Sequence, residues 1–459
     1  MKIFRSNLSL SLQRKFIFFL ISVLFFTSCN KDTVDISSKS TERYEADHLL
    51  KYYDQLCKFV KTTPGFFPPQ AARAYGYVSI AQYEAVIHGI ENGISLQNQL
   101  NGLAYYTLPQ PVADKEYNWA IASNAATHKM IKYMFGSKLS PANILSVDSL
   151  YKVTLDNLSA TADQNVVTRS TEFGVKIADV MYDYSKTDGG HESYIDPFQL
   201  PYTVPSDEHC WVPTSTVKTP LSPKWGTNRP FLINNIAKVQ PVMPVTFSTD
   251  QNSEFFREAM FVYNTVKNNT SEQVEIAKYW ADDPFATCTP TGHTFNILRQ
   301  ILESERVTLS KASVAFARMG IAENDAFIAC WKGKYDYVLI RPISYIQKYI
   351  DPNFKTVIGT PPFPAYTSGH SCEMGAGARI FTDLFTNGNG DYPFTDYTQL
   401  QFGYKARNFQ NFDQMASECA NSRLYGGIHY VFDNSKGLVV GKAIGDNVNT
   451  EIKWPIFVR

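Results

Sequence analysis

Apolar residues recur at intervals of three and four along most of this chain, which is the spacing of the buried face of a helix. In the first part of the chain the pattern predicts helices at about 46–60, 70–91, 112–135, 140–156 and 161–186. Farther along it predicts helices at about 250–267, 270–281, 293–303 and 305–332. Ser271 is a candidate N-cap within this second group. The alternation typical of β-strands is scarce, so the pattern predicts a mostly α-helical protein.

Residues 187–250 interrupt the helical pattern. Nine prolines lie in this stretch, from Pro197 to Pro244, and the apolar residues follow no sustained period. Proline removes a backbone donor and disfavours regular structure on either side of it. We therefore expect a long ordered connecting loop between a helical region at 45–186 and a second one at 251–459.

The N-terminal segment has the order of a secretory signal. Basic residues precede an apolar run at 16–26, and Thr27-Ser28-Cys29 follows it. A cysteine directly after small residues resembles a bacterial lipobox, which implies that 1–28 is a lipoprotein signal peptide, that Cys29 carries lipid and that 29–44 is a polar tether. An uncleaved signal anchor is the alternative, although the run is short for a membrane span. We expect an exported protein whose lipid anchor holds it to a bacterial membrane, on the outer membrane or the periplasmic face.

Composition and charge narrow the possible partners. The 459 residues include 43 basic and 43 acidic side chains, so the net charge is zero, and 31 Phe and 27 Tyr indicate a folded body. A neutral chain gives no indication of nucleic acid or of an anionic membrane surface as a partner. Any membrane contact is expected only through the lipid anchor, and no feature of the sequence indicates an oligomeric state. Positive charge needed for function must be concentrated locally.

The cysteines and most histidines suggest no metal site. Besides Cys29 there are six cysteines, an even number that permits disulfides in an exported protein, but their wide spacing names no pairing and no CxxC occurs. We expect mostly buried thiols. His88 and His128 fall on predicted helices and are interpreted as packed or surface residues, whereas the roles of His191 and His209 stay open.

Three segments, at 331–342, 361–370 and 422–433, concentrate the candidate chemistry. They supply Lys334, Arg341, Ser368, His370, Arg423, His429 and Asp433. Any one of these residues alone is more often a surface charge or a satisfied buried polar group. The ordered combination is far more specific, because three cations, a hydroxyl and two imidazoles suit a tetrahedral, multiply charged oxyanion.

The spacing within these segments predicts how the groups are presented. Lys334 and Arg341 are seven residues apart and can share one helix face, with Arg341 at the helix end because Pro342 follows it. Ser368-Gly369-His370 opens an apolar helical run, where free amide N–H groups can hold an oxyanion. Gly426-Gly427 is expected to separate Arg423 from a helix that carries His429, with Asp433 one turn farther on to fix the imidazole tautomer.

These three segments resemble the signature of the superfamily that joins type 2 phosphatidic acid phosphatases and vanadium-dependent haloperoxidases, and more narrowly the haloperoxidase branch. Trp331 lies three residues before Lys334, and Phe363 lies five before Ser368, as in residues that line the halide region of vanadium chloroperoxidases. Thr367 departs from the family pattern by standing where many members have proline. It removes no ligand.

The resemblance extends over about residues 45–450. The stretches at 271–284 and 289–293 are similar to a region in which an aspartate supports a vanadate-binding arginine, and Asp283, or next Asp282, matches that aspartate. The segment 68–86 resembles an early helix of these enzymes. The resemblance implies an all-α fold of two packed helical bundles of the vanadium chloroperoxidase type, with the proline-rich loop between them.

The resemblance also implies a cofactor and a reaction. Vanadate would have His429 as its axial ligand, and Lys334, Arg341, Arg423, Ser368 and the Gly369 N–H would hold its oxygens. His370 would exchange protons while hydrogen peroxide and halide react. Trp331, Phe363, the stretch at 280–283 and the lack of membrane-spanning segments favour this haloperoxidase interpretation.

Two alternatives remain at this stage. Phosphate can occupy the same cage, so a phosphatase acting on a phosphomonoester would use His429 as nucleophile, Asp433 as its support and His370 as the acid for the leaving oxygen. A non-catalytic oxyanion-binding lipoprotein is the lesser alternative, which the complete ligand set disfavours.

Overall fold

The computed structural model describes residues 40–239, 241–386 and 390–457, and it confirms a mostly α-helical fold. The expected signal peptide, the lipidation site at Cys29 and most of the expected tether lie outside the described residues. The antiparallel strands β1 (Phe394–Asp396) and β2 (Arg407–Phe409) form the one small sheet of the described chain. Short 3-10 helices occur at Thr41–Arg43, Ile87–Gly89, Leu103–Tyr105, Gly136–Lys138, Trp225–Thr227 and Thr398–Phe402.

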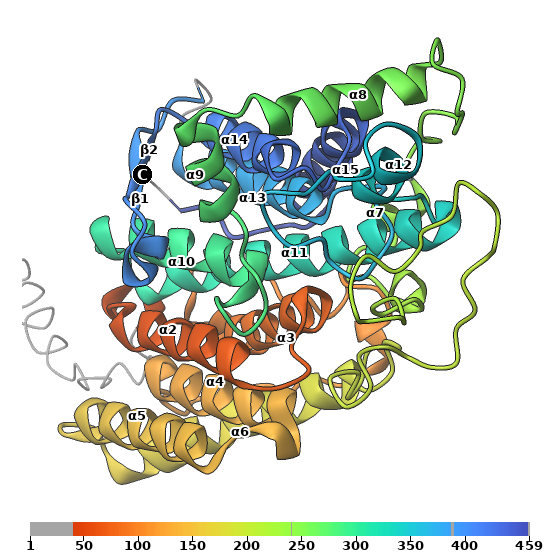
Figure 1. Cartoon of the computed structure of the whole chain (residues 1–459). Coiled ribbons are helices and arrows are strands. Elements are labelled where there is room, and N and C mark those ends of the chain that lie inside the picture. Colours follow the sequence, from red (N-terminus) through yellow and green to blue (C-terminus); the bar gives the residue numbers. More distant parts are fainter. Residues whose placement is uncertain (1–39, 240, 387–389, 458–459) are drawn as a thin grey trace, which may run out of the picture.

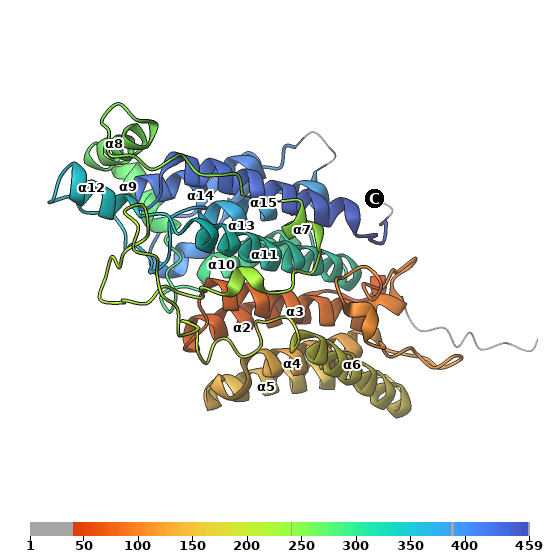
Figure 2. The same ribbon diagram turned by 90° about the vertical axis from the view of Figure 1, so that its right-hand side faces the viewer.

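The first five helices form one side of the molecule (Figures 1 and 2). They are α2 (Asp47–Thr62), α3 (Pro68–Val86), α4 (Trp119–Phe135), α5 (Pro141–Ser159) and α6 (Gln164–Ser185). All five were predicted, but the helix expected from residue 112 begins seven residues later. The Asn118 side chain accepts hydrogen bonds from the N–H groups of Ala120 and Ile121, and this N-cap sets the start.

The proline-rich stretch contains little regular structure. Within its described residues we find one 3-10 turn, at Trp225–Thr227, and one short helix, α7 (Asn234–Ala237). The Trp211 N–H donates to the Val338 carbonyl and the Leu221 N–H to the Pro362 carbonyl, at 2.7 and 2.8 Å. The stretch is thus attached to the two segments that precede Arg341 and Ser368.

The remaining long helices follow in the middle and on the other side of the molecule. They are α8 (Glu254–Lys267), α9 (Ser271–Tyr279), α10 (Thr289–Ser304), α11 (Leu309–Tyr337), α12 (Pro342–Tyr349), α13 (Gly369–Phe385), α14 (Phe412–Tyr425) and α15 (Val431–Glu451). The N-cap of α9 is Thr270, not Ser271 as predicted. Thr270 and Gln273 exchange side-chain and backbone hydrogen bonds in a capping box.

Helix α11 runs through the middle of the molecule, between α3 on one side and α13 on the other (Figures 1 and 2). It is buried almost around its whole circumference, which explains why apolar residues occur on every face of it, among a few buried polar ones. At its crossing with α3, a Cβ on Gly320 would lie 2.9 Å from the Ser79 side chain and 3.0 Å from the Gly76 Cα. Glycine permits this close approach, and the hydrophobic core continues from α2–α6 through α11 to α13–α15.

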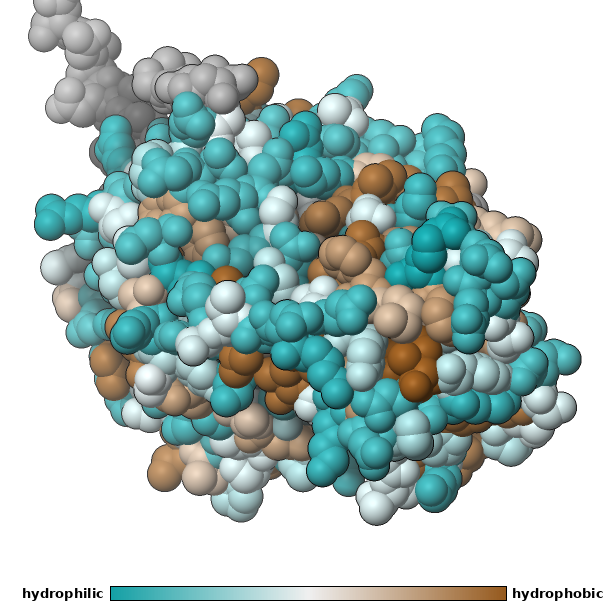
Figure 3. All heavy atoms as spheres, turned by 45° about the horizontal axis from the view of Figure 1, so that its top comes forward, coloured by the Kyte–Doolittle hydropathy of each residue, from teal (hydrophilic) through white to brown (hydrophobic). Residues whose placement is uncertain are grey.

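The cysteines follow the expected pattern. Cys57 and Cys288 form a disulfide between α2 and the start of α10, a pairing that the sequence did not name. The other described cysteines, Cys210, Cys330, Cys372 and Cys419, are free and buried. Within the described ranges, no helix combines the length and the apolar character needed to cross a bilayer. The face in Figure 3 is mainly hydrophilic, with separate apolar patches.

Candidate active site

The three predicted segments meet inside the C-terminal half of the molecule. Lys334 lies in the last turn of α11, Ser368 caps α13, and Arg423 lies in the last turn of α14. Burial lowers the pKa of His429, and the charges of Arg341, Lys334 and Arg423 lower it further, so these cations lie around one imidazole. The structure brings together the residues that the sequence suggested.

Two local predictions were wrong. Helix α11 ends at Tyr337, and Val338 follows it in the left-handed region with a φ of 46°, so Lys334 and Arg341 do not share a helix face. Arg341 instead is the extended N-cap of α12, with Pro342 as the first helical residue. A residue before proline avoids the helical region, and proline suits the first helical position, so this sequence marks a helix start as readily as an end.

His429 also lies outside a helix. Helix α15 begins at Val431, and the peptide from Gly427, whose φ is 78°, leads to it. Asp433 sits in the first turn of α15, where its Oδ2 accepts from His429 Nδ1 at 2.8 Å and from the Tyr430 N–H at 3.1 Å. The predicted support of His429 by Asp433 is therefore present. The two residues do not share a helix, however, because His429 precedes α15 and Asp433 lies in its first turn.

Arg341 defines the tautomer of His429. Its Nη1 lies 3.1 Å from His429 Nε2 and also donates to the Ile428 carbonyl at 2.9 Å. A guanidinium can only donate, so Nε2 is the acceptor and the ring proton is on Nδ1, which faces Asp433. The Nε2 lone pair thus faces the cationic side of the site.

The N–H donors of the cations are used very differently. The three N–H groups of Lys334 face the carbonyls of Pro364, Ala365 and Thr367. Arg341 Nε donates to the Phe363 carbonyl at 2.8 Å, but its Nη2 has no partner among the described residues. Lys334 therefore acts as a charge that also holds the 364–367 loop, whereas Arg341 keeps a free donor.

Arg423 and His370 show the same incomplete pairing. Arg423 Nη1 donates to the Trp280 carbonyl at 2.6 Å, whereas its Nε has no partner in the described chain, and neither does His370 Nε2. Burial, with the nearby charges of Arg423 and His293, lowers the pKa of His370 well below its usual range. His370 is thus a neutral imidazole at neutral pH.

The site has an excess of positive charge. Lys334, Arg341 and Arg423 are at most 2 % exposed, and none of them forms a salt bridge with any described carboxylate. Burial is the main reason that the pKa of Lys334 falls to about 8 and that of Arg341 to about 9. Asp433 offsets only part of this charge, since burial raises its own pKa to about 7. Buried charges without counter-ions are costly.

Phe363 and Trp331 form an aromatic wall beside the cations. The Phe363 ring centroid lies 5.0 Å from Lys334 Nζ and 5.0 Å from Arg341 Cζ. Trp331 packs 5.0 Å from that ring, and its Nε1 donates to the Leu221 carbonyl at 3.2 Å. Phe363 lines the cavity beside the site, whereas Trp331 is buried and is not among the lining residues, so a halide region formed by the two stays a prediction.

A cavity of about 260 Å³ leads to these groups. Phe363, His370 and Arg423 line it, and Phe67 and Phe285 are among its apolar residues. Phe67 immediately precedes α3, so both halves of the helical fold contribute to the cavity. The lining is mostly apolar, and Arg423 is the one cation among the described lining residues, so its interactions are stronger there than in bulk water.

The two aspartates proposed to support Arg423 have separate positions. Asp283 lines the cavity, and burial raises its pKa while the charge of Arg423 lowers it. The carboxylate of Asp282 instead contacts His293 and Gln399. Both aspartates raise the pKa of Arg423 against the effect of its burial. Their influence on Arg423 is electrostatic and does not involve an ion pair within 4 Å.

A vanadate ion fits this set of donors. Orphaned buried N–H groups on Arg341 and Arg423, an amide at the start of α13 and uncompensated positive charge are the complement of a multiply charged tetrahedral oxyanion. The Nε2 lone pair of His429 could serve as the ligand to its central atom once the Arg341 Nη1 N–H that donates to it turns to an oxygen of the oxyanion. Phosphate has the same shape and charge and fits the donors equally.

Comparison with solved structures identifies the family. A structure described as the first bacterial vanadium-dependent iodoperoxidase matches with a TM-score of 0.80 and 30% sequence identity, covering 91% of this chain and 98% of that one. The chain belongs to the vanadium-dependent haloperoxidase family. Within the family, a holo-type bacterial vanadium-dependent chloroperoxidase matches with a TM-score of 0.64 and 14% identity, over 86% of this chain and 95% of that one.

Other comparisons agree on the fold of this haloperoxidase family member. An apo-type bacterial vanadium-dependent chloroperoxidase matches with a TM-score of 0.62 and 12% identity, covering 90% of this chain and 98% of that one. The family model for the VCPO second helical-bundle domain matches residues 314–455. No curated protein matches the chain. The expected fold of two packed helical bundles is therefore confirmed.

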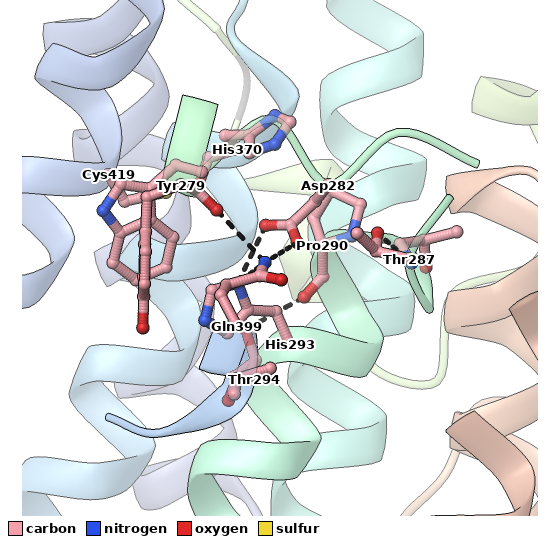
Figure 4. A network of polar contacts seen from close by, with 12 residues as sticks. Tyr279, Asp282, Thr287, Pro290, His293, Thr294, His370, Gln399 and Cys419 are labelled. Atoms are coloured by element: carbon pink, nitrogen blue, oxygen red, sulfur yellow. Dashed lines mark hydrogen bonds and ion pairs between the residues drawn. The ribbon is translucent and has the colours of Figure 1, made fainter. Parts of the chain in front are cut away.

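The sequence did not indicate one polar network next to the site, which is centred on His293. His293 lies between the carboxylates of Asp282 and Asp396, and Gln399 completes the network (Figure 4). His293 stands in the 289–293 stretch that carried part of the resemblance, but Asp396 and Gln399 lie more than 100 residues farther on. No local pattern indicates that they meet.

Proposed function

We propose that this protein is a vanadate-dependent haloperoxidase that oxidises a halide with hydrogen peroxide. The observation that carries the proposal is the buried cluster of Lys334, Arg341 and Arg423 beside the unprotonated Nε2 of His429. Among the described residues, no carboxylate forms a salt bridge with any of these three cations. Vanadate bound there would supply the centre at which peroxide becomes reactive toward halide, while the protein tunes its charge.

The residues of the chain then have distinct roles. Arg341, Arg423 and the amide at Gly369 bind the oxyanion, and Lys334 contributes charge. His429 presents Nε2, and Asp433 holds the proton on Nδ1. His370 is neutral with a free Nε2, so it can accept a proton from peroxide and return it later. Phe363 provides an apolar wall for the incoming halide.

The test is a comparison of two activities on one protein. Purified protein loaded with vanadate is assayed for halogenation of an activated phenol with peroxide and each halide, beginning with iodide because of the similarity to a bacterial iodoperoxidase. The vanadate-free protein is assayed with phosphomonoesters. We expect halogenation by the loaded protein and weak phosphatase activity that vanadate inhibits. Phosphatase activity without any halogenation from acid to neutral pH would overturn the proposal in favour of the phosphatase alternative.

We also propose that the enzyme is exported and anchored through lipid on Cys29. The basic–apolar–small order of residues 1–29 supports this, and so does the Cys57–Cys288 disulfide, which is typical of oxidising compartments. Cells expressing the wild type and Cys29→Ser are fractionated. Recovery of the wild type in the soluble fraction with Met1 intact contradicts the lipid anchor.

A further inference from the structure

His293 occupies an unusual buried position behind the cationic site. Its Nδ1 lies 2.9 Å from Asp282 Oδ2 and its Nε2 lies 2.8 Å from Asp396 Oδ2, and all three side chains are at most 2 % exposed. A carboxylate at each ring nitrogen requires a proton on both, so His293 is an imidazolium ion between two anions. Burial alone would lower its pKa, but the two carboxylates raise it to about 10.

This ion holds one short segment, residues 279–282 (Figure 4). The Trp280 indole stacks on the His293 ring with a centroid distance of 4.6 Å and an interplanar angle of 18°. Gln399 Nε2 donates to the Tyr279 carbonyl at 3.1 Å and to Asp282 Oδ1 at 2.8 Å. Asp282 itself has a φ of 48°, a left-handed conformation that aspartate tolerates and that these contacts maintain.

The same segment contacts both reactive sides of the site. The Trp280 carbonyl accepts from Arg423 Nη1 at 2.6 Å, and that bond is the only described hydrogen bond of this guanidinium. The backbone of Trp280 and Ala281 also lies close enough to His370 to raise its pKa against the effect of burial. Any movement of the segment would therefore change the orientation of Arg423 and the surroundings of His370 together.

We propose that His293, clamped by Asp282 and Asp396, is a positioning residue that sets the orientation of Arg423 and His370 through the Trp280–Asp282 backbone. The inference rests on the proposed function, because it assigns His293 a role toward the oxyanion that those two residues handle. His293 itself touches neither the cavity nor the oxyanion-binding donors. Supporting groups of this kind commonly change metal or anion affinity by about 10- to 100-fold when they are removed.

Vanadate affinity of the vanadate-free protein, measured by isothermal titration, is the main readout. His293→Gln removes the charge and one donor, and we expect it to weaken vanadate binding about tenfold or more. His48→Gln is the matched control, since His48 is a buried imidazole with a bond to Ser123 in the first group of helices. We expect this control to bind vanadate within twofold of the wild type.

A double-mutant cycle separates positioning from general loosening. Arg423→Lys keeps a cation but cannot keep the geometry of the Trp280 contact, so the effect of His293→Gln should shrink to less than threefold in that background. Equal effects in both backgrounds, or a His293→Gln affinity within threefold of wild type, would overturn the inference.

A second variant covers the case in which His293→Gln does not fold. Gln399→Met removes the amide that fastens Tyr279 and Asp282 but leaves the three charged side chains in place, and we expect it to weaken vanadate binding at least threefold. Unchanged affinity in Gln399→Met would then overturn the inference. Absence of vanadate binding by the wild type is a different result, which would reject the proposed function itself.

Discussion

Replacing Arg341 by methionine should remove most of the vanadate affinity. Methionine keeps a long apolar side chain against Phe363 but has no N–H group. Of the five N–H groups of a guanidinium, Nε and Nη1 use theirs on the protein, so the two on Nη2 remain for the oxyanion. Truncating one partner of a buried charge pair costs about 2–5 kcal/mol. A loss of about 3 kcal/mol corresponds to a Kd roughly two decades weaker.

Titration calorimetry and thermal unfolding both measure this loss. At a vanadate concentration of about 100 times the wild-type Kd, binding stabilises the wild type by about 2.7 kcal/mol. The same concentration would roughly equal the Kd of Arg341→Met, where the stabilisation falls to about 0.4 kcal/mol. Arg318→Met is the matched control, because Arg318 is a buried arginine on α11 that donates to Asn449 and pairs with Asp383. A Kd within threefold of wild type for Arg341→Met would refute the donor assignment.

Four further predictions follow from the same contacts. Lys334→Met should weaken vanadate binding by about tenfold, which is less than Arg341→Met. It should lower the melting temperature more, because it leaves the carbonyls of Pro364, Ala365 and Thr367 without their donor. Calorimetry and thermal melts on both variants test the order. His370→Ala should abolish peroxide-dependent halogenation without abolishing vanadate binding, and Phe363→His should change the halide preference, as steady-state assays with each halide would show. The stabilising contribution of His293 should be complete below about pH 6.5 and lost as the pH rises through about 10, since its pKa is raised in the folded state. Denaturation of wild type and His293→Gln at pH 6, 8 and 10 should show that the difference between their free energies of unfolding narrows as the pH rises. A difference that stays constant would contradict this prediction.

The helical fold was predictable because its signal is local. The apolar period located every long helix of the first half, with limits that differ by up to seven residues. The Ser368-Gly369-His370 start of α13 was recognised from a capping residue before an apolar run. The start of α4 was missed because Val112, Ala113 and Tyr117 precede it and a single N-cap, Asn118, decides the boundary. Where the helix limit depends on one side-chain hydrogen bond, the period alone does not show it.

The identities of the candidate site residues were predictable from the sequence, but the elements that carry them were less so. The seven residues were found by type and order, yet Arg341 and His429 were assigned to helices that they only flank. Proline after Arg341 is compatible with the end of one helix or the start of the next, and spacing alone does not distinguish them. The His293 network was missed for a different reason. Its members meet only through the packing of α10 against β1 and the turn after it, which sequence distance conceals.

Hydrogen-bond donors, more than charge, distinguish the two cations on either side of Val338. In the sequence Lys334 and Arg341 are both candidates for oxyanion binding, the lysine as a point charge and the arginine as a planar fork. In the structure, each N–H group of Lys334 faces a carbonyl. Arg341 donates to two carbonyls and to His429, and its Nη2 has no partner among the described residues. Lys334 can attract an anion but has no donor left to orient it, while Arg341 can do both. Lys334 therefore holds the 364–367 loop and contributes positive charge. Arg341 can also orient an oxyanion, because its Nη2 donors have no partner among the described residues. The geometry of a bound oxyanion would thus depend on those donors that the protein itself leaves unpaired.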